Sequence, residues 1–474
     1  MAMGRMDKEH QETLWVETSS LPCAPGHPFY EQLNGLLAKY GFEAMVEAEC
    51  TQYYAEVLGR PSIPPVAYFK ALMVGYFEGI DSERGIAWRV ADSMALRSFL
   101  GYALTERTPD HSSLSRTRRL MSVETHRRVF HWVLDVLAKE GLLRGKTLGV
   151  DATTLEANAA LRSIVRRDTG ESYEQFLTGL AQSSGIETPT REDLAKLDKK
   201  RPKKGSNKDW KNPHDPDARI TKMKDGQTHL AHKAEHAVDM DTGAVLSVTL
   251  QPADLGDTQT VKATLDEARA NVQTVAADPE ARRRLEPARE VVLDKGYHSN
   301  DTVRDLQEDG LRTYVSEPKR GRRQWEGKTK ERDAVYANRR RVRGAYGKKL
   351  LRKRGELIER SFAHCYETGA MRRTHLRHHP NILKRLLIHV GAFNLSLVFR
   401  RTTGFGTPRG LQERAGKATK TFRDVIAGGL RDIGQAMSTF VSHWKLLQRQ
   451  TRYPKPIWHP LTGWLQKQPF TTGC

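Results

Sequence analysis

The pattern of hydrophobic positions predicts an all-helical region at the start of the chain. From about residue 28 to 142, apolar residues recur at intervals of three and four, with a clear stripe at Val129, Phe130 and Val133. Prolines separate the helices, and the stretch 108–113 has the turn and capping residues of a helix start. The remaining pattern is a mixture of strands and helices.

Two short apolar runs each end abruptly in an aspartate. Residues 147–150 lead into Asp151, and residues 291–293 lead into Asp294, which precedes a glycine turn. Each run is typical of a buried strand that delivers one carboxylate to the carboxyl edge of a sheet. A single such aspartate is more often a helix cap, but two in the same setting favour a shared site.

A β-hairpin and a polar insertion are predicted between these two strands. Residues 229–239 and 244–250 are strand-like and are joined by an Asp-Thr-Gly turn. The mostly polar residues from about 161 to 226 form the insertion. Its lysine-rich run, 199–208, indicates either a mobile solvated loop or a phosphate contact.

Three histidines on the first hairpin strand have a spacing that suggests a metal site. On a strand, however, His229 faces away from His232 and His236, and no cysteine or acid cluster completes a tetrahedral site. We therefore expect no metal at this triple. Asp257, which precedes a helical run, is interpreted as an N-cap.

A third acid lies on a helix predicted from about residue 349 to 367. Ile358 and Phe362 belong to its apolar stripe, and Glu359 sits beside that stripe. Glu356 lies one turn earlier and further from the stripe. Glu359 is therefore the preferred third acid.

The patterns divide the chain into four parts. These are a polar N-terminal segment (1–24), a helical N-terminal domain (25–143), a mixed strand-and-helix domain (144–400) and a linker with a C-terminal helical tail (401–474). The mixed domain contains the insertion at about 161–226, a basic segment at about 319–354 and all three acids.

The charge balance favours a polyanionic partner. The chain has 77 Lys and Arg against 57 Asp and Glu, a formal net charge of +20, which points to nucleic acid. The apolar-leaning run 386–399 is short and carries His389 and Asn394, so we expect no membrane span, and no secretory segment opens the chain. Four scattered cysteines indicate no disulfide framework or zinc finger and fit a reducing cytoplasm.

The basic segment 319–354 is the strongest candidate for a DNA contact. It has sixteen Lys and Arg against three acids, and aromatic residues are interleaved with the charge, as is common where proteins hold distorted or single-stranded DNA. For any single aromatic, packing is the commoner role. The candidate DNA-contacting residues, including arginines of the N-terminal helices, are Arg116, Arg118, Arg119, Lys319, Arg320, Arg322, Arg323, Trp325, Arg339, Arg340, Arg341, Arg343, Arg372 and Arg373.

The acids Asp151, Asp294 and Glu359 together suit a pair of divalent cations. Hard cations prefer carboxylate oxygens, and two of them about 3.5–4 Å apart can activate an attacking oxygen and stabilise a leaving one at phosphorus. The order strand Asp, strand Asp, helix Glu is that of an RNase H-like core.

Several blocks of the sequence resemble a known family. They are Gly-Val-Asp-Ala-Thr (149–153), His-Lys-Ala to Thr-Gly (232–243), Asp-Lys-Gly-Tyr (294–297), Ile-Glu-Arg-Ser-Phe (358–362) and Pro-Asp-His-Ser-Ser-Leu-Ser-Arg (109–116). Over roughly residues 25 to 400 the chain resembles bacterial insertion-sequence transposases of the DDE type, in the broad IS-four and IS-five grouping.

The resemblance implies an α/β fold: an RNase H-like mixed sheet with flanking helices, preceded by an all-α N-terminal domain and followed by C-terminal helices. It implies that Asp151, Asp294 and Glu359 bind two Mg²⁺ or Mn²⁺ ions. It also implies a homodimer or larger complex on double-stranded DNA, at the terminal inverted repeats and the target. Hydrolysis would free a 3′-hydroxyl, which would then attack target DNA in the bacterial cytoplasm, near the nucleoid.

Alternatives remain open at this stage. An RNase H-like nuclease without strand transfer would use the same three acids, and a catalytically silent DNA-binding protein derived from a transposase would lack at least one of them. In part of the grouping an Arg stands four residues before the glutamate and a Lys seven after it. For Glu359, the position four residues before is Gly355 and the position seven after is Tyr366. For Glu356, the position four residues before is Arg352, as in that part of the grouping, but the position seven after is Ala363 and not a lysine.

Overall fold

The computed structural model describes residues 27–55, 62–201, 205–223, 226–319, 321, 323–412, 437–439 and 441. The chain divides into two compact units, Met1–Pro408 and Arg409–Cys474. Every helix and strand named below lies in the first unit. The predicted segment 1–24, most of the predicted tail 401–474, and the candidate DNA contacts Arg320 and Arg322 lie outside the described residues.

The N-terminal region is helical, as its hydrophobic spacing predicts. Its helices are α1 (Pro28–Lys39), α2 (Phe42–Cys50), α3 (Pro65–Phe77), α4 (Glu83–Asp92), α5 (Met94–Leu100), α6 (His111–Leu120) and α7 (Val123–Lys139), with a 3₁₀ turn η2 (Thr51–Tyr53). Asp110 and Ser122 begin α6 and α7 because their side chains accept backbone N–H bonds from Ser113 and Thr125.

Helix α15 (His379–Thr402) joins the helical region to the sheet. It packs against α3 and α7 on one side and against strand β6 (Val245–Pro252) on another. Asn394 donates to the carbonyl of Val245 and accepts from its N–H, at 2.8 and 2.9 Å. Among the described residues, α15 alone is long and apolar enough to cross a membrane, but 94% of its apolar stretch is buried inside the protein. Packing on several sides therefore explains its apolarity.

A mixed six-stranded sheet forms the centre of the unit. Its strands are β1 (Thr147–Glu156), β4 (Arg219–Lys222), β5 (Thr228–Asp239), β6, β7 (Glu290–Leu293) and β8 (Arg312–Val315). Strand β5 pairs antiparallel with β1 along one edge, and with β4 and β6 along the other. On the far side of β1, strands β7 and β8 run parallel to it. The predicted hairpin is confirmed, as are strands at 147–150 and 291–293. Asp294 directly follows β7, whereas β1 continues past Asp151 to Glu156.

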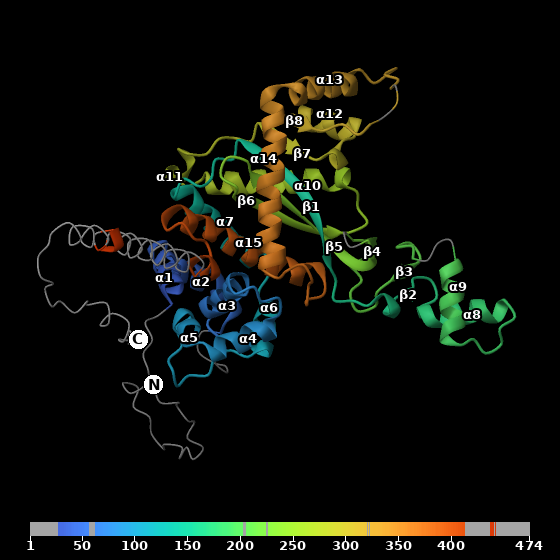
Figure 1. Cartoon of the computed structure of the whole chain (residues 1–474), viewed down its shortest axis with the longest axis horizontal. Helices are drawn as coiled ribbons and strands as arrows, with labels where there is room; N and C mark the ends of the chain where they lie inside the picture. The colour runs from blue at the N-terminus through green and yellow to red at the C-terminus, as the bar shows by residue number, and fades with distance from the viewer. Residues whose placement is uncertain are drawn as a thin grey trace, which may run out of the picture. The chain divides into compact units, whose positions relative to one another are not determined.

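Helices cover both faces of the sheet. Successive residues of a strand point to opposite faces, so Glu235 reaches Thr264 of α10 (Asp257–Val275) while His236 contacts Ser361 of α14 (Ala345–Phe362) at 3.1 Å. Figure 1 shows α14 as a long helix that crosses the strands. The other elements are α11 (Pro279–Arg282), η4 (Lys295–Tyr297), α12 (Asn300–Glu308), α13 (Thr329–Arg343) and a π-helical turn η5 (Ala363–Thr368).

The insertion between β1 and β4 is folded. It contains η3 (Leu161–Ser163), β2 (Val165–Arg166), α8 (Tyr173–Ser183), α9 (Arg191–Lys200) and β3 (Trp210–Lys211), and β2 pairs with β3 (Figure 1). Trp210 is buried with Ile164 and Leu230, which ties the insertion to the end of β5. The expectation of a loop is wrong for residues 199 and 200, because α9 extends through them.

Candidate active site

The structure brings two of the three predicted acids together. Strands β1 and β7 are parallel and in register at Val150 and Leu293, so Asp151 and Asp294 follow at the same level of the sheet. Both carboxylates lie against one guanidinium: Nη1 of Arg354 is 2.8 Å from Oδ2 of Asp151, and Nη2 is 3.7 Å from Oδ1 of Asp294. The two acids therefore share one cationic group.

Helix α14 can reach these acids because Gly149 has no side chain. A Cβ at Gly149 would lie 3.3 Å from Ile358, 3.4 Å from Arg354 and 2.5 Å from the sulfur of Met240. The last distance is too short for any real Cβ. A side chain at residue 149 would therefore have to displace Met240 and would crowd α14, so the glycine favours the close approach of α14 to β1.

The electrostatic environment of Asp151 is balanced between opposing effects. Burial raises the pKa of its carboxyl above the ordinary value, and the nearby Asp294 raises it further. Arg354 and the backbone N–H of Ala152 lower that pKa and offset part of the rise. Additional positive charge at this point would favour both charged carboxylates.

Glu359 is exposed and does not contact either aspartate. Within the described part of the chain its carboxylate has no hydrogen bond or ion pair, whereas the carboxylate of Glu356 pairs with Arg360 at 2.6 Å. Residues three apart share one side of a helix, so Glu359 lies on the side of Phe362, whose ring packs against His236. Sequence reasoning missed Arg354, although a basic residue one turn before the buried Ile358 is a signal for it.

A buried polar network supports the segment after Asp294. The hydroxyl of Tyr297 donates to Glu235 at 2.6 Å, and Lys233 Nζ lies 2.6 Å from Asp257. Burial raises the pKa of Glu235, and its hydrogen bonds, including that from Tyr297, offset part of the rise. The N-cap of α10 is Gly256, so the prediction of Asp257 as N-cap is wrong; Asp257 is the first helical residue and pairs with Lys233.

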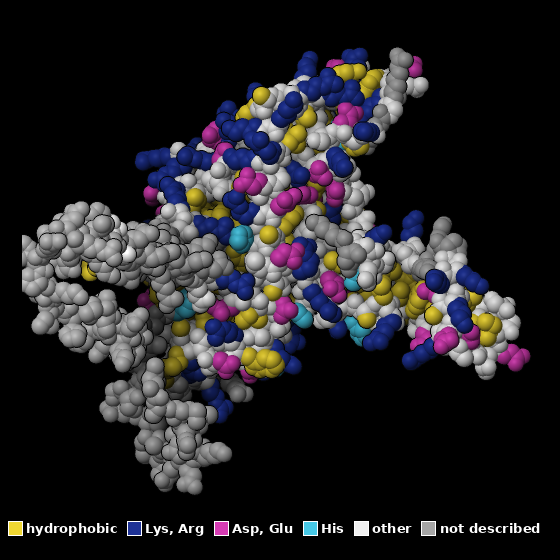
Figure 2. All heavy atoms as spheres, viewed as in Figure 1, with side chains coloured by type: hydrophobic (Ala, Val, Ile, Leu, Met, Phe, Trp, Pro, Cys, Tyr) yellow, Lys and Arg dark blue, Asp and Glu magenta, His cyan; other side chains and the backbone are white. Residues whose placement is uncertain are grey.

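The predicted DNA-contacting residues fall into two groups. Figure 2 shows Lys and Arg side chains concentrated over α13 and the start of α14. Exposed members of the predicted set are Arg116, Arg119, Lys319, Arg340, Arg343 and Arg373. These six remain predictions as DNA contacts.

The second group is engaged within the protein. Arg118 is 6% exposed and held by Glu83, so packing is the role that the structure favours for it. Arg323 and Arg339 both form ion pairs with Glu317. Arg341 donates a hydrogen bond to Thr313, and Arg372 donates one to Thr153. The ring of Trp325 lies 5.6 Å from the guanidinium of Arg323. A phosphate would have to compete with these partners.

Comparison with known families agrees with the geometry. Residues 22–120 match a family described as "Transposase domain", and residues 198–395 match one described as "Transposase DDE domain". No curated protein matches the chain. The two matches cover more than half of the chain, which therefore belongs to the transposases of the DDE type found in insertion sequences. Asp294 and Glu359 lie within the second match, whereas Asp151 lies between the two.

Proposed function

We propose that this transposase cuts the ends of its insertion sequence and joins the freed 3′-hydroxyl to target DNA at a site formed by Asp151, Asp294 and Glu359. The observation that carries the proposal is the pair of carboxylates on adjacent parallel strands, Asp151 within β1 and Asp294 directly after β7, both beside the Arg354 guanidinium. An ordinary sheet has no need to hold two acids side by side on neighbouring strands.

An RNase H-like core is part of this proposal. The sheet order supports it, because an antiparallel hairpin, β5 and β6, lies on one side of β1 and two parallel strands, β7 and β8, lie on the other. Asp151 lies within the central strand and Asp294 follows its parallel neighbour, and α14 packs against both strands.

Divalent metal ions fit the site, since a cationic group already lies against both carboxylates. Two Mg²⁺ or Mn²⁺ ions, once bound there, would supply charge stabilisation and a more reactive oxygen nucleophile. Asp151 and Asp294 would hold them, and Glu359 would join by a change of its side-chain rotamer, since it is solvent-exposed and has no competing partner among the described residues. Arg354 would give up its contact with at least one carboxylate and become available to a DNA phosphate.

The proposed substrate is double-stranded DNA, at the element's terminal inverted repeats and at the target. The exposed basic residues of α13 and α14 support this, because neutralised phosphates provide most non-specific affinity. We further propose a homodimer on DNA, acting in the bacterial cytoplasm on the nucleoid. A nuclease without strand transfer is the second candidate, since it would need the same acids.

We expect Glu359→Gln to lower magnesium-dependent cutting by on the order of 10²- to 10³-fold, because an amide is a poor ligand for a hard cation. The assay uses a duplex carrying the terminal repeat found beside the gene. Glu356→Gln is the matched control, since Glu356 is also exposed and, among the described residues, its carboxylate pairs with Arg360. That control should cut within about threefold of wild type. If Glu356→Gln is the inactive variant, the third ligand is Glu356 and the assignment of Glu359 is wrong.

A further inference from the structure

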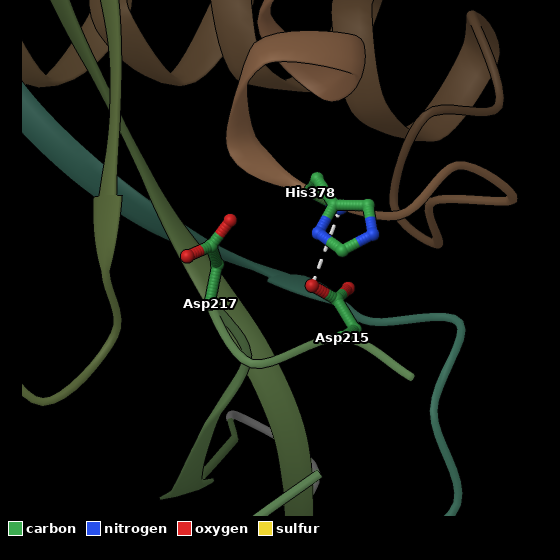
Figure 3. A group of neighbouring side chains, drawn as sticks. All are labelled: Asp215, Asp217 and His378. Atoms are coloured by element: carbon green, nitrogen blue, oxygen red, sulfur yellow. Dashed lines mark hydrogen bonds between the residues drawn. The ribbon is translucent and has the colours of Figure 1, made fainter. Parts of the chain in front are cut away.

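A second cluster of donor groups lies at the base of the insertion, outside the three catalytic acids. Asp215 and Asp217 precede β4, and His378 is the residue before α15. One side-chain donor atom from each of these residues lies within 4.8 Å of the other two. Figure 3 shows the two carboxylates and the imidazole ring facing one another.

A fourth donor, His232 of β5, contacts one member of this cluster, Asp215. His232 and Asp215 are both fully buried, and Nε2 of the histidine is 3.2 Å from Oδ2 of the aspartate. The two groups form an ion pair without an aligned hydrogen bond, and neither atom has another hydrogen-bond partner. Buried polar atoms that lack hydrogen bonds are costly, and an ion bound by both atoms would compensate them.

The separation of these two atoms fits a shared ion. Ligand bonds of about 2.0–2.2 Å in a tetrahedral site place neighbouring donor atoms about 3.3–3.6 Å apart, close to the separation observed here. The other ring nitrogen of His232 lies 3.1 Å from Nε2 of His379. A second partner of this kind orients a metal-binding imidazole and fixes its tautomer.

The backbone at the start of α15 orients both carboxylates. The N–H of His378 donates to Oδ1 of Asp215 at 3.2 Å, and the N–H of His379 donates to Oδ2 of Asp217 at 2.9 Å. One oxygen of Asp215 is thereby held, and its other oxygen faces His232. His378 has a φ of 68°, a conformation that is strained for a residue with a side chain.

We propose that Asp215, Asp217, His232 and His378 bind one divalent transition-metal ion, of which Zn²⁺ is the best match. Two imidazoles with two carboxylates suit zinc, whereas Mg²⁺ prefers oxygen ligands alone. The ion would fasten the base of the insertion to β5 and to the start of α15. The sequence lacks an obvious sign of this site because its donors are spread over more than 160 residues.

The test is zinc content and zinc affinity of the full-length protein. We expect one Zn²⁺ per chain to remain after dialysis against magnesium buffer, as measured by mass spectrometry of the metal. The variants Asp217→Asn and His378→Ala should each bind Zn²⁺ at least about 100-fold more weakly, since even the loss of a supporting outer ligand costs about 10- to 100-fold. Both side chains are at least partly exposed, so these variants should fold.

Matched controls separate this site from its surroundings. His214→Ala removes the imidazole next to Asp215 in the chain, and Asp254→Asn removes a carboxylate that pairs with Arg219 of β4. Both variants should retain zinc. Asp294→Asn should also retain it, which distinguishes this site from the catalytic one. Zinc should raise the melting temperature of wild type but not of His378→Ala. Equal zinc affinity in wild type, Asp217→Asn and His378→Ala, or zinc loss only in Asp294→Asn, would overturn the proposal.

Discussion

Asp294→Asn is expected to lower magnesium-dependent cutting of a terminal-repeat duplex by on the order of 10³-fold or more. This corresponds to about 4 kcal/mol of lost transition-state stabilisation, which is within what a metal ion contributes to displacement at phosphorus. The substitution keeps the size of the side chain and an oxygen that Arg354 can approach, so folding should be retained. Asp151→Asn should behave in the same way, because its carboxylate contacts the same guanidinium.

The matched control is Asp301→Asn. Asp301 lies in the first turn of α12, seven residues after Asp294, and its side chain is 72% exposed and pairs with Arg304, so its charge is outside the site. Binding of the same duplex without metal should be within about threefold of wild type for all three variants. If Asp294→Asn cuts DNA as fast as Asp301→Asn, Asp294 is not a metal ligand.

Gly75→Ala is expected to destabilise the folded protein by about 3–5 kcal/mol. A Cβ at Gly75 in α3 would lie 1.9 Å from Nη2 of Arg385, a fully buried side chain of α15. That guanidinium donates to the carbonyls of Leu72 and Ile80 at 2.8 and 3.1 Å. The added methyl group must displace the arginine or separate the helices, and a buried charge without its partners costs about this much.

Gly35→Ala in α1 is the control for the stability measurement. A Cβ at Gly35 would meet no atom within 4 Å, so the substitution should be neutral or stabilise by up to about 1 kcal/mol. Urea unfolding followed by circular dichroism gives both free energies of unfolding. Equal midpoints for the two variants would mean that Arg385 does not occupy the space beside Gly75.

The sequence located the two strand aspartates because their signal is local. A buried strand shows a short apolar run, and a charged residue at its end has no packing explanation, so Asp151 and Asp294 could be selected without knowledge of the fold. The choice of Glu359 as third ligand depends on helix periodicity alone. Periodicity predicts on which side of the helix the residue lies, but not its distance from the sheet. The structure leaves Glu359 exposed and therefore leaves that prediction to experiment.

Contacts between distant parts of the chain could not be predicted in this way. Arg354 lies 203 residues from Asp151 along the chain, and only the packing of α14 on Gly149 brings the two together. The contact between Asp215 and His232 could not be predicted either, because it forms only when the insertion has folded back onto β5. The helices of the insertion were predictable in principle, because Ser172 with Gln175 and Thr190 with Asp193 form capping boxes.

Strand transfer is the most direct test of the central claim that one acidic site both cuts and joins DNA. The measurement follows a labelled, pre-cleaved terminal-repeat duplex with a 3′-hydroxyl as it becomes joined to a target plasmid in magnesium. Wild type should form the joined product, and the product should be absent with a 3′-deoxy end, without divalent metal, and with Asp151→Asn. Efficient cutting by wild type without any joined product would contradict the claim and favour a nuclease. Joining by Asp151→Asn at the wild-type rate would show that the chemistry occurs elsewhere.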